Sequence, residues 1–103
     1  MTVEELTALD WCDVVLESLA WTNDGRDFVL CVIGPHDRRR TVTCAWAATF
    51  DMQIQSRADT SGQPMTWDAT FELLPDGRIF VSIDFASAGH IKLVCNEIDV
   101  RFE

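Results

Sequence analysis

The chain has 103 residues, and 48% of them are hydrophobic, so it can bury a core unaided and is neither a disordered tail nor a collagen-like segment. This length predicts one domain over residues 1–103. Seventeen Asp and Glu residues outnumber eight Lys and Arg residues, which gives a net charge of −9. Because that charge repels phosphate backbones, we expect no direct binding to nucleic acid.

The N-terminal segment predicts a short helix. Thr2 and Glu5 have the spacing of a capping box, and Val3, Leu6 and Leu9 follow at helical spacing. The segment is acidic where a signal peptide would be basic, and no apolar stretch approaches the length of a membrane span. We therefore expect a cytoplasmic protein that makes no membrane contact.

The first half of the chain then predicts four strands. Residues 14–21 are apolar at both parities, which indicates a strand covered at least in part on both faces, although the segment could also extend the helix. Asp24 and Gly25 favour a tight hairpin with positive φ. After that hairpin, the second, third and fourth strands are expected at residues 28–33, 41–47 and 50–54.

The C-terminal part alternates most clearly. Residues 67–73 and 79–85 flank a turn at Asp76-Gly77, which predicts a hairpin with one apolar and one polar face. The apolar phase changes near Asn96, which indicates a β-bulge or a tight turn. The last strands are expected at residues 91–95 and 98–102. The fold class predicted is mainly β (α+β), an antiparallel sheet or sandwich of six to eight strands with a short N-terminal helix.

The cysteines do not form a metal-binding pattern. No two of them are spaced as C-x-x-C, the close pairing typical of structural zinc sites, although three disulfide pairings are open to four cysteines. We expect no metal and no cofactor. In the cytoplasm the four thiols would stay reduced and act as small apolar core residues. They are Cys12, Cys31, Cys44 and Cys95.

Few residues offer catalytic chemistry. Cys12 or His90, with an acid such as Asp13 nearby, could serve a small enzyme, but the simpler interpretation is a partly buried cysteine and two turn histidines. No local signature of a nucleophile surrounds either residue, so we predict that the protein is not an enzyme. A small enzyme using Cys12 or His90 is the alternative.

The arginine cluster and the tryptophans each allow a binding role or a purely structural role. Residues 38–40 are three consecutive arginines, which could hold a phosphate or an acidic partner, or could pair with nearby acids. Trp46 and Trp67 fall on apolar faces and are expected in the core. Trp11 and Trp21 flank the first strand, where each could be a core residue or an exposed contact residue. Exposed tryptophans would also allow a homodimer, so a self-associating structural domain is a further alternative.

Acidic residues are unevenly placed along the chain. The first 25 residues contain six acids and no Lys or Arg, and further acids occupy outward positions of the C-terminal strands. Such clustering serves either solubility and protection of sheet edges or the steering of a basic protein partner. We predict a non-catalytic binding module, an immunity or inhibitor protein that neutralises a basic toxin or a nucleic-acid-handling enzyme. The predicted partner-binding residues are Asp68, Glu72, Asp84, Glu97, Asp99, Trp11 and Asp13.

The order of these features resembles small bacterial β-rich proteins, including some immunity proteins of polymorphic toxin systems. Members begin with an aromatic-His-Asp step that enters a strand, and Asp10-Trp11-Cys12-Asp13-Val14 looks like that step, with Cys12 in place of His. They end with a pattern like G-x-I-x-L-x-C-x-x-I-x-V, which the segment at residues 89–100 resembles. The resemblance implies a non-catalytic protein that binds and neutralises a cognate toxin.

Overall fold

The computed structural model describes residues 1–11, 14–54, 68–85 and 89–103, and it confirms the predicted fold class. These residues form eight strands, one short α-helix and one 3-10 turn, η1. No helix among them has the length and apolar content to cross a bilayer. The elements are α1 (Val3–Ala8), β1 (Val15–Thr22), β2 (Asp27–Ile33), η1 (Pro35–Asp37), β3 (Arg39–Ala45), β4 (Ala48–Ile54), β5 (Asp68–Leu73), β6 (Ile79–Asp84), β7 (Gly89–Cys95) and β8 (Glu97–Phe102).

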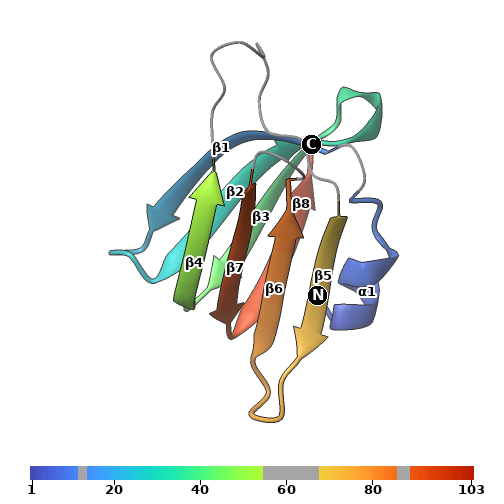
Figure 1. Ribbon diagram of the computed structural model, residues 1–103. Helices are drawn as coiled ribbons and strands as arrows, with labels where there is room; N and C mark the ends of the chain where they lie inside the picture. The colour runs from blue at the N-terminus through green and yellow to red at the C-terminus, as the bar shows by residue number, and fades with distance from the viewer. Residues whose placement is uncertain (12–13, 55–67, 86–88) are drawn as a thin grey trace.

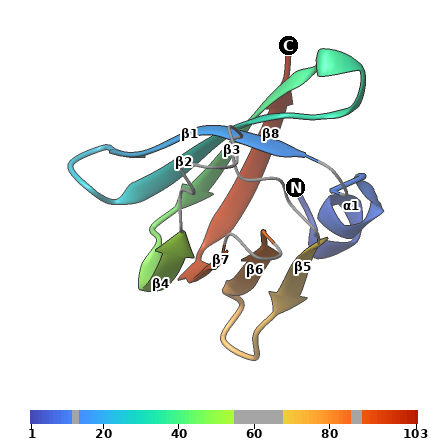
Figure 2. The ribbon, with the colours of Figure 1, turned by 45° about the horizontal axis from the view of Figure 1, so that its top comes forward.

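The strands form two antiparallel sheets that lie one behind the other (Figure 1). Sheet I has the strand order β1-β2-β3-β8, and sheet II has the order β4-β7-β6-β5. Helix α1 lies beside β5 at one side of the molecule, as Figures 1 and 2 both show. Each sheet therefore has one face turned toward the other sheet and one face turned outward.

The core lies between the two sheets because the strands bury apolar side chains at alternate positions, as β2, β3 and β6 show most clearly. In β2 the buried residues are Phe28, Leu30 and Val32, and in β7 they include Ile91 and Leu93. The opposite parity of each strand points outward. Each outward side chain therefore lies on the outer surface of sheet I or on that of sheet II, according to the sheet that contains its strand.

The predicted helix start is confirmed. The Thr2 hydroxyl accepts a hydrogen bond from the Glu5 N–H, and the Glu5 carboxylate accepts one from the Thr2 N–H, each at 3.1 Å. Hydrogen bonding to Thr2 lowers the pKa of Glu5. The N-terminal ammonium donates to the carbonyl of Ile98 in β8 at 3.0 Å. The helix is therefore joined to both sheets, through β5 and through β8.

The turn at Asp24 and Gly25 is also confirmed, since both residues have positive φ between the paired strands β1 and β2. The phase change near Asn96 has a cause other than the bulge or tight turn expected there. The chain bends at Asn96 and passes from β7 in sheet II to β8 in sheet I. The inward parity changes because the strands on either side of the bend face the core from opposite sheets.

Candidate functional site

Three of the predicted binding residues share the outward face of sheet II. Asp68 and Glu72 in β5 and Asp84 in β6 alternate with buried residues, so they point away from the core. The antiparallel register places Asp68 directly opposite Asp84. Like charges in that position destabilise a sheet, because side chains directly opposite are about 5 Å apart at Cβ.

Asp51 of β4 extends this group on the same face. It pairs in register with Lys92 of β7, and its Oδ2 lies 3.3 Å from Nε2 of His90. We call the outward face of sheet II that carries Asp51, Asp68, Glu72 and Asp84 the acidic face. Lys92 is the one Lys or Arg at the described outward strand positions of this face. Four carboxylates therefore face a single ammonium group.

An open depression of about 330 Å³ lies within the acidic face. Its lining combines a carboxylate, a hydroxyl, an imidazole and an ammonium group. The His90 side chain is 28% exposed and that of Asp51 is 61% exposed, so this ion pair is in contact with solvent. The depression can receive a small polar group or one side chain of a partner. It is lined by Ser82, Asp84, Gly89, His90 and Lys92.

The other predicted acids do not join this face. Glu97 and Asp99 lie at outward positions of β8, in sheet I, and so point to the opposite side of the sandwich. Asp99 also pairs with Arg101 of the same strand, at 3.3 Å. Asp13 lies outside the described residues. The structure thus divides the predicted binding surface between two sheets.

The prediction that Trp11 is a surface contact residue is wrong. Its side chain is only 6% exposed, and its indole N–H donates to the carbonyl of Leu6 at 2.7 Å. Its ring packs on Phe71 of β5 with 5.3 Å between centroids. Trp11 therefore joins the segment after α1 to the edge of sheet II, because burying a large ring and satisfying its N–H favour the interior.

Trp46, one of the two tryptophans expected in the core by parity, is instead exposed. Trp46 is 55% exposed because β3 ends at Ala45 and the chain turns there, with Trp46 at a φ of 56°. The guanidinium of Arg26 lies 5.0 Å from the centroid of its ring. Trp21 is 46% exposed, whereas Trp67 lies outside the described residues.

The cysteines follow the sequence prediction in part. Cys44 and Cys95 are buried free thiols between the sheets, as expected. A hydrogen bond with Cys95 and burial raise the pKa of Cys44. Cys31 is also free, but it lies at an outward position of β2 and is only partly buried. Cys12 lies outside the described residues, within which no group of His, Cys, Asp and Glu could hold a metal ion.

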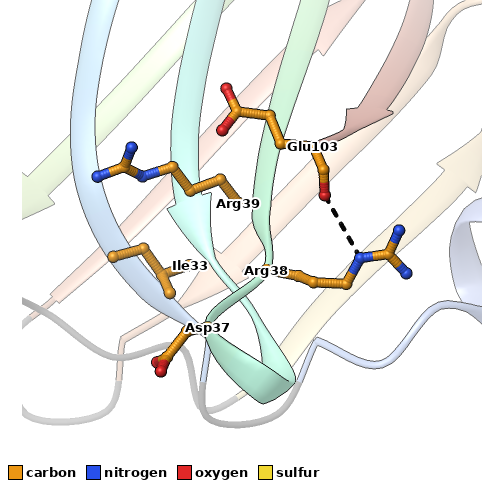
Figure 3. Close-up of a pocket in the computed structure, with 5 residues that line it drawn as sticks. All are labelled: Ile33, Asp37, Arg38, Arg39 and Glu103. Carbon is orange, nitrogen blue, oxygen red and sulfur yellow. Dashed lines mark hydrogen bonds between the residues drawn. The ribbon is translucent and has the colours of Figure 1, made fainter.

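The three consecutive arginines diverge. Arg39 pairs with Glu17 at 3.2 Å, and the Arg38 Nε donates to the main-chain carbonyl of Glu103 at 3.4 Å. Figure 3 shows Arg38 and Arg39 pointing in opposite directions around a cavity of about 370 Å³. Arg40 is buried and donates to the carbonyl of Asp10 at 2.6 Å. The arrangement favours separate pairing over a common phosphate site.

Comparison with known proteins supports the fold alone. The structure is similar to the crystal structure of an uncharacterized protein from Neisseria gonorrhoeae, with a TM-score of 0.71. That likeness covers 89% of this chain and 93% of the other, at 11% sequence identity. No family model matches the chain, and no curated protein matches it. The two proteins thus share an arrangement of strands.

Sequence reasoning missed one carboxylate of the acidic face, Asp51, and the lysine that lies opposite it, Lys92. Asp51 and Lys92 each alternate with apolar neighbours, and this pattern predicts that both side chains point outward. Their proximity could not be predicted, because it depends on β4 pairing with β7 across a long segment of chain. Strand order, more than parity, decides which outward residues meet.

Proposed function

We propose that this protein is a non-catalytic binding module of the immunity or inhibitor type, which presents the acidic face to a basic protein partner in the cytoplasm. The observation that carries the proposal is the gathering of four carboxylates and one lysine at the described outward positions of sheet II. Carboxylates outnumber the cationic side chains at these positions, so the face carries a negative potential. A cationic partner surface would be attracted to that potential.

The partner suited to such a face is rich in lysine and arginine. A toxin with a basic surface fits, and so does a nucleic-acid-handling enzyme, because carboxylates can occupy a groove that binds phosphates. Complementary potentials raise the association rate most strongly at low salt. Binding should therefore weaken steeply as ionic strength rises.

The test begins with capture of the partner from the organism that encodes the chain, followed by affinity measurements on the purified complex. The variant Asp68→Asn/Asp84→Asn removes two charges from the acidic face. The matched control, Glu97→Gln/Asp99→Asn, removes two charges from β8 on the other side. We expect the first variant to weaken binding by about tenfold or more and the second by less than about threefold. Equal losses in both variants, or affinity that is indifferent to salt, would refute the proposal.

A second candidate function, a small enzyme, is favoured by one contact. Asp51 lies 3.3 Å from His90 Nε2 and could orient the imidazole as a general base beside Ser82 in the same depression. Hydrolysis of p-nitrophenyl acetate, a general ester probe, tests this candidate. An enzyme should exceed the rate of free imidazole and lose that excess in His90→Gln. If the wild-type protein and His90→Gln both hydrolyse the ester no faster than free imidazole, the enzyme candidate is excluded and the binding module is retained.

A further inference from the structure

Two of the buried cysteines meet where the chain passes from one sheet to the other. Cys44 is the next-to-last residue of β3 in sheet I, and Cys95 is the last residue of β7 in sheet II. The Asn96 N–H, at the bend between β7 and β8, donates to the carbonyl of Ala45 at 2.9 Å. This bond holds the end of β7 against the end of β3. The two thiols lie in contact there, joined by a hydrogen bond between their side chains.

The thiol pair is enclosed by the core. Both side chains are 0% exposed, and the residues opposite them in register, Ile98 in β8 and Ile79 in β6, are buried as well. A packing role needs only a small apolar side chain at each position. Contact between the two sulfurs goes beyond that need, because a disulfide forms only between cysteines whose Cβ atoms are about 4 Å apart. Sulfurs already in contact need only a short movement to reach bonding distance.

The hydrogen bond makes the two thiols chemically unequal. The S–H of Cys44 donates to the sulfur of Cys95, and this lowers the pKa of Cys95. The same bond, together with burial, raises the pKa of Cys44. Because the thiolate is the nucleophilic form, Cys95 is suited to attack an oxidant, and Cys44 is suited to attack the oxidised Cys95 in a second step.

The position of the pair near the ends of strands gives a route for a small oxidant. Trp46, two residues after Cys44, is 55% exposed, and Asn96, directly after Cys95, is exposed as well. Strand ends open locally at a smaller cost in free energy than strand centres. Hydrogen peroxide is small and uncharged, so such openings admit it to the pair.

We propose that Cys44 and Cys95 form an oxidation site, at which hydrogen peroxide converts the two thiols into a disulfide that links sheet I to sheet II. The Cys95 thiolate attacks one peroxide oxygen and the O–O bond breaks. The released hydroxide takes the Cys95 proton to form water, and a sulfenic acid remains on Cys95. The Cys44 sulfur then attacks the Cys95 sulfur, the S–O bond breaks, and the second hydroxide takes the Cys44 proton to form water. Two electrons pass from the sulfurs to the peroxide.

The disulfide should stabilise the sandwich. It closes a loop of roughly 50 residues and so restricts the unfolded chain. In a domain of this size, we expect such a bridge to raise the melting temperature by about 10 °C or more. Because both cysteines point inward, the bond leaves the side chains of the acidic face unchanged. The site is therefore independent of the proposed binding of a basic partner.

Oxidation of the purified protein tests the proposal. The variant Cys12→Ser/Cys31→Ser keeps only the pair, and its reduced form is treated with hydrogen peroxide. The mass of the monomer should fall by about 2 Da, which corresponds to the two thiol hydrogens. Digestion without reductant should give two peptides joined through Cys44 and Cys95, and the melting temperature should rise by about 10 °C. Dithiothreitol should reverse both changes.

The variant Cys44→Ala is the matched control. It keeps Cys95 and removes its partner, so peroxide should add oxygen to Cys95 without a bridge and without a rise in melting temperature. The same mapping on the wild-type protein makes the result independent of whether the variants fold, and the bridge should again join Cys44 and Cys95. An unchanged mass, addition of oxygen in place of a bridge, or a bridge through Cys12 or Cys31 in the wild-type protein would overturn the proposal.

Discussion

The two outward faces of the sandwich differ although the two inward faces are alike. Both sheets bury apolar side chains at alternate positions, because the core admits little else. Outward, sheet II carries four carboxylates and one lysine, whereas sheet I has uncharged side chains at its centre and charged ones, including Glu97 and Asp99, around them. The excess of acids is therefore a property of particular surfaces as well as of the whole chain. The inward residues are constrained by packing and are similar in the two sheets. The outward residues are free of that constraint, so they determine which partner each face can bind.

The acidic face depends on one close backbone approach, and breaking it should have the largest effect. Gly89 begins β7 with a φ of +126°, and a Cβ there would lie 1.7 Å from the carbonyl oxygen of Gln53. Gly89→Ala should force β4 away from β7 and separate Asp51 from His90. We expect the free energy of unfolding to fall by about 3 kcal/mol or more in urea denaturation.

Gly77→Ala is the matched control for that substitution. Gly77 also has positive φ, at +88°, but no atom lies within 4 Å of the added Cβ. Only the backbone strain remains, which costs about 1 kcal/mol. Similar losses in Gly77→Ala and Gly89→Ala would show that contact with β4 is unimportant.

The reactivities of the cysteines compare an outward position of sheet I, Cys31, with inward positions of sheet I, Cys44, and sheet II, Cys95. At low micromolar concentration, Cys31 should react with iodoacetamide at least about 100-fold faster than Cys44 or Cys95, because buried thiols are protected. The raised pKa of Cys44 lowers its thiolate fraction further. Peptide mapping by mass spectrometry measures the three rates. Equal reactivity of Cys31 and Cys44 would contradict the assignment of the two sides of this sheet.

Relief of like-charge repulsion should have the smallest effect. Asp68→Asn removes one of the two carboxylates that oppose each other on the acidic face, and we expect a gain of about 0.5 kcal/mol in stability at low salt. Asp99→Asn removes a carboxylate that pairs with Arg101 and should give no gain. Urea denaturation at two salt concentrations measures both variants, and the gain should shrink at high salt. A loss of stability in Asp68→Asn would mean that repulsion at this position is negligible.

The contrast between the faces could be predicted only in part from the sequence. Alternation around Asp76-Gly77 placed Asp68, Glu72 and Asp84 outward, because a short hairpin determines its own register. Glu97 was also outward, but β8 pairs with β3 and joins the other sheet. That pairing joins residues far apart in the chain, and local pattern carries no information about it.

The tryptophans show a second limit of local pattern. Trp46 continues the parity of Val42 and Cys44, yet the strand ends at Ala45 and the next residue turns outward with positive φ. Trp11 precedes a strand and could face either way by pattern. Its burial depends on contact with Phe71, which only the tertiary structure brings near.

The central claim is that the acidic face, and not the outward face of sheet I, receives a cationic partner. A deca-lysine peptide titrated into isotope-labelled protein, with amide chemical shifts recorded at low and high salt, tests it most directly. We predict shifts in β5, β6 and β7 around Asp68, Asp84 and His90, which disappear at high salt. Shifts centred on β1 and β2, or shifts that persist at high salt, would contradict the account.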